Sequence, residues 1–196
     1  MTGQKNRFST TEKLWNLDDK QLKTPRHDAM VLWLMDKNNG QQIINFKTSM
    51  HKKDYWENDL YYTLKNIKVI TEVPIYANKN FIGGYADLIY RGFYDVHTIL
   101  KNGDDDGVHE TFESKLIEVK PYIDSFGAVL RQINSYKTMI EEATQYNNLS
   151  RLNTRIEEYY IFTLDDRFDA QFESQGINML HPPKGVTIDD IVNMYL

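Results

Sequence analysis

The chain has 196 residues, of which 41% are hydrophobic and 26% are charged, and its formal net charge is −5. This composition predicts one globular domain with a sizeable core, and it excludes a protein that coats nucleic acid through bulk positive charge. The absence of cysteine excludes disulfides, thiolate metal sites and cysteine nucleophiles. No apolar run approaches the length of a membrane span and no signal-peptide core follows the N-terminus, so we expect a cytoplasmic protein without a membrane partner.

The first 48 residues predict an N-terminal arm and a helix, both packed on the core. Residues 1–24 are polar and mixed, and we expect an arm or short helix on the surface. Thr24 can cap a helix and Pro25 suits the first helical position, so the helix should begin there. The run 29–35 is apolar on every side, which is typical of a helix buried in a core or in a partner interface.

The middle of the chain predicts one further helix and several strands. Ser49 can cap a helix over 49–64, because Trp56, Leu60 and Leu64 recur at four-residue spacing. Pro74 implies a sheet edge or a strand end. Strands are predicted over 68–76, 83–94, 96–100 and 108–119, with a hairpin turn at 101–107.

The last third predicts alternating helices and strands. We expect a helix from Asp124 or Ser125 to about 146, a strand at 158–164, a short helix from 166, a short strand at 177–180 and a last helix from Thr187. The predicted fold class is α/β, a single domain with a central mixed β-sheet flanked by helices. Residues 49–164 would form its core and 165–196 a C-terminal extension of the same domain.

Two of the predicted strands carry the residues that suggest chemistry. Glu118 and Lys120 lie two positions apart, so they share one face of a strand. Asp87 lies in an earlier apolar strand, and the chain between the two is long enough for a hairpin that brings Asp87 beside Glu118. Two carboxylates, with the Val119 carbonyl as a third ligand, suit Mg²⁺ or Mn²⁺, and Lys120 could orient the attacking water. Each signal alone also fits a solvated strand face.

The order of these residues adds a resemblance to a family. Asp87, the 118–120 segment and the helix after it resemble the PD-(D/E)xK nuclease superfamily, in which Asp and Glu hold the metal and Lys assists the nucleophile. Ala86 stands where that superfamily conventionally has proline. The resemblance implies a restriction-endonuclease-like core, a catalytic Asp87, Glu118 and Lys120, and a magnesium or manganese cofactor.

The resemblance extends to the following helix and to one further acid. Gln132 and Tyr136 resemble the Gln-x-x-x-Tyr motif of the RecB-type branch, where these residues face the active site and the DNA, and their spacing places them on one helical face. The superfamily usually adds an acid from a helix before the sheet. Glu57 is the best match and Glu72 is the competitor, while an ordinary surface charge is the alternative interpretation of both.

Basic residues around this site predict contacts with phosphates. They are His51, Lys52 and Lys53 at the head of the predicted 49–64 helix, and Arg131 and Lys137 on the later helix. The other histidines, at 27, 97, 109 and 181, are scattered without metal-ligand spacing.

The function predicted from these residues is a metal-dependent DNA nuclease. The alternative is a nuclease-fold subunit that binds nucleic acid or assembles with partners without cleaving. The sequence leaves open exonuclease against endonuclease, DNA against RNA, and the presence of a second copy or a partner protein.

Overall fold

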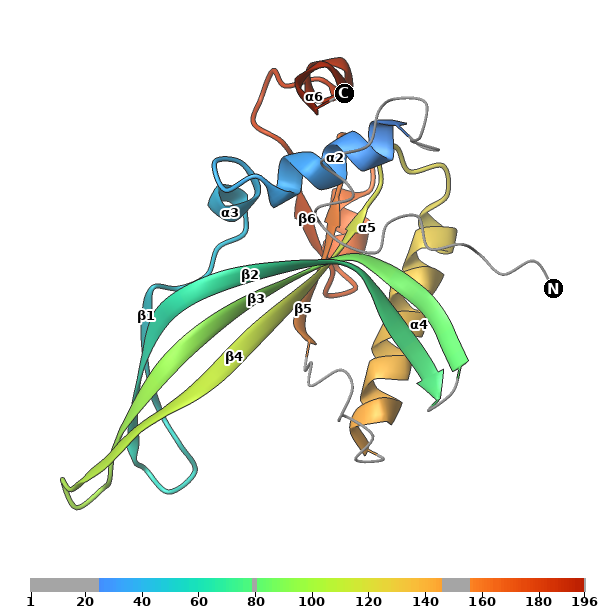
Figure 1. Ribbon diagram of the computed structural model, residues 1–196. Helices are drawn as coiled ribbons and strands as arrows, with labels where there is room; N and C mark the ends of the chain where they lie inside the picture. Colours follow the sequence, from blue (N-terminus) through green and yellow to red (C-terminus); the bar gives the residue numbers. More distant parts are fainter. Residues whose placement is uncertain (1–24, 79–80, 146–155, 196) are drawn as a thin grey trace.

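The protein is described here from a computed structural model, over residues 25–78, 81–145 and 156–195. One six-stranded sheet runs through the described chain, with its strands ordered as they occur in the sequence (Figure 1). They are β1 (Ser49–Lys53), β2 (Asp59–Asn78), β3 (Phe81–Ile99), β4 (Asp105–Val119), β5 (Ile156–Phe162) and β6 (Asn178–Leu180). Strands β1 to β4 pair antiparallel, whereas β5 pairs parallel to both β4 and β6. The predicted α/β domain with a mixed sheet is therefore confirmed.

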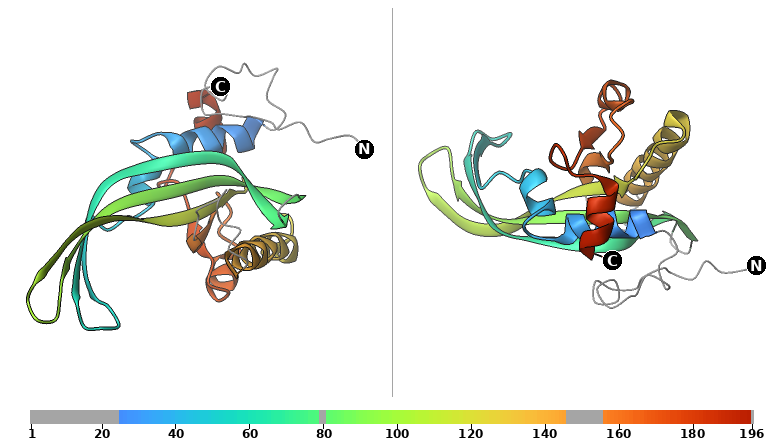
Figure 2. Two further views of the ribbon diagram at one scale, coloured as in Figure 1. Left: turned by 60° about the horizontal axis from the view of Figure 1, so that its bottom comes forward. Right: turned by 90° about the horizontal axis from the view of Figure 1, so that it is seen from above.

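Helices cover both faces of this sheet (Figure 2). They are α2 (Pro25–Met35), α3 (Gly40–Ile43), α4 (Phe126–Gln145), α5 (Asp169–Glu173) and α6 (Ile188–Tyr195). On one face α2 packs against α6, and on the other α4 and α5 cover the sheet. None of the helices in the described residues is long and apolar enough to cross a membrane.

The predicted helix over 49–64 is wrong. Residues 49–53 form β1 and 59–64 begin β2, and the two strands pair antiparallel around a turn at 54–58. The four-residue spacing that suggested a helix also places residues on one face of a strand, because four is a multiple of the strand period. Tyr61, Tyr62 and Thr63 have strong strand preferences, and these decide the outcome.

The sheet is strongly curled, and β1 with parts of β2, β3 and β4 extends far beyond the helices as an arm (Figure 1). We call residues 49–64 and 94–111 the distal arm; it contains β1, the β1–β2 turn and the paired parts of β2, β3 and β4. Beyond Leu64, β2 has only β3 as a strand neighbour among the described strands, so Pro74 lies on a sheet edge as predicted.

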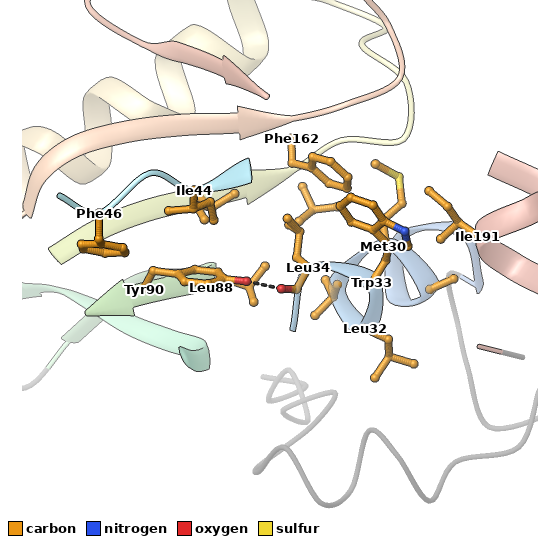
Figure 3. Packing of buried hydrophobic residues seen from close by; sticks show 14 of the residues in the cluster. Met30, Leu32, Trp33, Leu34, Ile44, Phe46, Leu88, Tyr90, Phe162 and Ile191 are labelled. Carbon is orange, nitrogen blue, oxygen red and sulfur yellow. Dashed lines mark hydrogen bonds between the residues drawn. The ribbon is translucent and has the colours of Figure 1, made fainter. Parts of the chain in front are cut away.

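Helix α2 lies in the core (Figure 3). All residues from Ala29 to Leu34 are buried within this chain. Of the two predicted locations for this apolar run, the core and a partner interface, the structure shows the core. The Trp33 ring stacks on Phe162 of β5, with 5.3 Å between ring centroids, and the Tyr90 hydroxyl donates a hydrogen bond to the Leu34 carbonyl. Because these contacts fix α2 against β3 and β5, they also fix what its first turn can reach. The predicted arm over 1–24 lies outside the described residues.

Candidate metal centre and active site

Asp87 and Glu118 lie at neighbouring positions of β3 and β4. The ladder pairs Leu88 with Ile117, so the next position places Asp87 opposite Glu118. At that point the Asp87 Oδ2 atom accepts a hydrogen bond of 2.8 Å from the backbone N–H of Val119. The predicted hairpin thus brings the two acids to one level of the sheet. We call Asp87, Glu118 and Lys120 the acidic rung.

Glu118 is buried, with 2% of its surface exposed. Its Oε1 atom accepts hydrogen bonds from Lys120 Nζ at 2.7 Å and from Gln132 Nε2 at 2.6 Å. Its Oε2 atom is buried and has no hydrogen-bond partner among the described residues. Burial, and then the charge of Asp87, raise the pKa of Glu118 to about 7, although Lys120 acts in the opposite direction. The site therefore holds a carboxylate oxygen that lacks a donor or a cation.

Helix α4 contributes the two residues of the predicted helical motif. Gln132 Nε2 is also 2.9 Å from the Tyr136 hydroxyl, which in turn donates to the Tyr85 carbonyl at 2.8 Å. Burial, and then the charge of Glu118, raise the pKa of Tyr136, so its hydroxyl keeps the proton that it donates. The pair therefore connects α4 to β3 and orients the Glu118 carboxylate.

His27, in the first turn of α2, is a site residue that the sequence interpretation missed. Its Nε2 atom lies 3.2 Å from Asp87 Oδ1, and its Nδ1 atom lies 3.1 Å from Asp28 Oδ1. Burial would lower the pKa of His27, but the two carboxylates outweigh it and raise the pKa to about 9. Burial likewise opposes ionisation of Asp87, and His27 and the Val119 amide hold the pKa of Asp87 below its usual value. The signal available in the sequence was a pair of polar residues opening an otherwise apolar helix.

The donor set of the rung fits a hard divalent cation. Two adjacent carboxylates supply oxygen donors, and a cation bound between them would give the buried Oε2 atom of Glu118 a partner. In the part of the chain that the structure describes, no three Asp, Glu or His side chains are grouped as metal ligands. Mg²⁺ is commonly bound by only one or two carboxylates and keeps several waters, so two carboxylates suffice. The Val119 carbonyl stays a predicted ligand.

The structure does not bring Glu57 to the rung. Glu57 lies in the β1–β2 turn, where its carboxylate pairs with Lys101, because the helix that was expected to carry it is a hairpin. Its competitor Glu72 is placed better. Glu72 of β2 lies between the pairs Thr71–Leu88 and Val73–Ala86, which puts it opposite Asp87 of β3. Its φ of 48° is unusual for a residue with a side chain.

The predicted phosphate contacts of β1 also lie away from the rung. His51 and Lys53 are 2.7 Å and 3.8 Å from the Asp59 carboxylate, and Lys52 Nζ lies 5.4 Å from the centre of the Tyr62 ring. All these contacts are within the distal arm. These side chains were expected near the rung because a helix was predicted to begin at residue 49. Residues 49–53 form strand β1 instead.

The two basic residues of α4 have different surroundings. Arg131 is exposed and directly precedes Gln132 on the helix. Lys137 Nζ lies 5.1 Å from the centre of the Tyr159 ring and 3.4 Å from the Gln175 carbonyl, on the flank of the helix that meets β5 and α5. Arg131 is therefore the better of the two for a phosphate contact.

Comparison of the chain with protein-family models, with curated proteins and with solved structures finds no match. Function therefore has to be inferred from the chemistry of the rung.

Proposed function

We propose that this protein is a metal-dependent nuclease that hydrolyses phosphodiester bonds in DNA, on a core of the restriction-endonuclease type. One observation carries the proposal. Glu118 is buried beside a second carboxylate, with one oxygen held by Lys120 and Gln132 and the other without a partner among the described residues. A buried carboxylate oxygen without a donor costs free energy, and a bound cation would offset that cost.

Asp87 and Glu118 would hold Mg²⁺ or Mn²⁺, with the Val119 carbonyl as a further donor. Such a cation, when bound, lowers the pKa of its water and stabilises charge on a phosphate. His27 neutralises Asp87 in the absence of metal, at a distance of 3.2 Å. The proton on His27 and the proton that Glu118 binds near neutral pH would be released as a cation takes over their role.

Lys120 is the residue of the rung best placed to meet the substrate. Its side chain is 25% exposed, against 3% for that of Glu118, so it reaches solvent beside the buried carboxylate. There it can orient a water molecule for attack on phosphorus and offset the charge that develops on the phosphate oxygens. Water adds across one P–O bond, which yields a phosphomonoester end and a hydroxyl end. Gln132 and Tyr136 act as positioning residues.

The test is cleavage of plasmid, linear duplex and single-stranded DNA with Mg²⁺ or Mn²⁺. We expect wild-type protein to cleave at least one of these substrates, and Lys120→Ala to be slower by roughly 10²–10³-fold, as for other lost electrostatic contacts to a transition state. Lys37→Ala, which removes an exposed charge between α2 and α3, is the matched control. Equal rates for wild type and Lys120→Ala would refute the assignment.

The non-cleaving alternative also has an observation in its favour. Both oxygens of Asp87 already have partners, His27 and the Val119 amide, and no group of three metal-ligand side chains occurs in the described residues. Fluorescence anisotropy with labelled DNA distinguishes the two functions. Binding of DNA without cleavage in either metal would support the alternative.

A further inference from the structure

The far end of the distal arm is built from two turns that are fastened together. We call residues 54–58 and 100–106 the arm tip (Figure 1). The Lys101 ammonium group forms an ion pair with the Glu57 carboxylate, and the Lys101 backbone N–H donates to Asn58 Oδ1 at 2.9 Å. Two contacts thus join the β1–β2 turn to the β3–β4 turn, so the tip presents one surface.

Two aromatic rings stand on this surface in contact with solvent. Tyr55 is 90% exposed and Trp56 is 71% exposed, and the rings meet edge to face with centroids 5.8 Å apart. Tryptophan is among the residues that most often carry the binding energy of protein interfaces, together with tyrosine and arginine. Nothing in the described residues covers these two rings.

The turn that carries the rings is held in one conformation by hydrogen bonds. Asp54 Oδ1 accepts from the backbone N–H groups of Trp56 and Asn58, each at 2.9 Å, and Asp54 Oδ2 accepts from Asn58 Nδ2 at 3.0 Å. Glu57 has a φ of 66°, a left-handed conformation that costs free energy for a residue with a side chain. A turn that is fixed before binding lowers the entropy cost of binding.

The charge around the rings is negative. Over residues 51–59 and 99–107 the chain carries six carboxylates against three lysines; the acids are Asp54, Glu57, Asp59, Asp104, Asp105 and Asp106. A surface of this sign repels phosphates and attracts lysine and arginine side chains. Charge therefore favours a basic protein surface over nucleic acid as the occupant.

The tip is also remote from the acidic rung. Twelve residues of β2 separate the ladder positions Asp59–Ile99 and Thr71–Leu88, which at the usual strand rise is about 40 Å. A small molecule or a short peptide that occupies the tip therefore does not reach the rung.

We propose that the arm tip is a docking site for a protein partner that offers an apolar pocket to Tyr55 and Trp56 and a rim of lysine or arginine around that pocket. The rings supply the buried contact, and the carboxylates supply orientation and selectivity against acidic surfaces. This proposal does not depend on the proposed nuclease function, because it uses no residue of the rung.

Selection of peptides from a random-sequence display library tests this proposal. The wild-type chain is the bait, and the double variant Tyr55→Ala/Trp56→Ala is used for counter-selection. We expect selected peptides to combine lysine or arginine with aromatic or aliphatic residues, and to bind the double variant at least about tenfold more weakly, the equivalent of one buried interface contact. Phe81→Ala removes another exposed ring, at the opposite end of β3, and should leave binding unchanged.

Four outcomes would overturn the proposal. They are a library that yields no peptide sensitive to the double substitution, selection of acidic peptides, a concentration-dependent dimer in sedimentation velocity that Trp56→Ala abolishes, and weaker binding of single-stranded DNA by Trp56→Ala. The third would assign the tip to self-association and the fourth to nucleic acid. Because both rings are exposed, the variants should fold, which circular dichroism verifies.

Discussion

Replacement of Glu118 by glutamine should change the pH dependence of stability in a direction fixed by the rung. In the folded protein the pKa of Glu118 is about 7, against 4.5 for an ordinary glutamate, so the folded state binds this proton more tightly than the unfolded state. Ionised Glu118 therefore destabilises the fold increasingly as pH rises from 4.5 to 7, and by a constant amount above that. Glutamine does not titrate, so the unfolding free energy of the variant does not fall over this pH range for this reason.

The size of the effect follows from the shift. Each pKa unit corresponds to about 1.4 kcal/mol, so the shift from 4.5 to about 7 is worth on the order of 3 kcal/mol. Glutamine also loses the charge-assisted hydrogen bond from Lys120 and places an amide where Oε2 has no partner. That loss is constant with pH, so only the pH-dependent part of the difference reports on burial of the charge.

Urea unfolding followed by circular dichroism at a series of pH values measures this difference. The unfolding free energy of Glu118→Gln minus that of wild type should rise by roughly 3 kcal/mol between pH values below 4.5 and above 7. Glu142→Gln, an exposed substitution on α4, is the control and should give a flat difference. A flat or falling difference for Glu118→Gln would refute the claim that this carboxylate is buried beside another negative charge.

Three further predictions concern the core and the first turn of α2. Trp33→Ala should lower the unfolding free energy by about 3–5 kcal/mol in urea titrations, because it empties a fully packed site. Gly84→Ala should destabilise by about 1–3 kcal/mol, since its new Cβ would lie 2.8 Å from the buried Tyr136 ring. Gly83→Ala should cost less, because its two closest contacts are with the end of the flexible Met139 side chain, which can move. His27→Gln should lower the unfolding free energy most below pH 6.5, and this loss should shrink as pH rises towards 9. The reason is that the stability from the raised pKa of His27 disappears over that interval in wild type. A loss of unfolding free energy that grows with pH would contradict the His27 ion pairs.

Local signals in the sequence were sufficient for much of the fold and for part of the rung. The hairpin between β3 and β4 and the start of α4 depend on turn residues and on Ser125, whose hydroxyl accepts a 3.4 Å hydrogen bond from the Ala128 N–H. Strand alternation places Glu118 and Lys120 on one side, and helical spacing places Gln132 and Tyr136 on one helical face, whereas the contact between Gln132 and Glu118 was expected only from the family resemblance.

The remaining features depend on contacts between residues distant in sequence, or on a residue spacing that fits both a helix and a strand. His27 reaches Asp87 only because α2 docks across the sheet through Trp33, and no spacing in the sequence encodes that docking. Glu57 was misplaced because a four-residue spacing satisfies both a helix and a strand. The curl of the sheet, which carries the arm tip away from the rung, arises from twist accumulated over three long strands, which residue patterns do not specify.

Binding of Mn²⁺, followed by the electron paramagnetic resonance signal of the free ion, tests most directly whether Asp87 and Glu118 form a metal centre. We predict that the wild-type chain binds Mn²⁺, that Asp87→Asn and Glu118→Gln each weaken binding by at least about tenfold, and that Glu142→Gln does not. Metal binding should also stabilise wild type by about 2.7 kcal/mol at a hundredfold excess over its dissociation constant, and Glu118→Gln by no more than about 1.4 kcal/mol at the same Mn²⁺ concentration. Equal Mn²⁺ affinity in wild type, Asp87→Asn and Glu118→Gln, or no binding by wild type, would contradict the account.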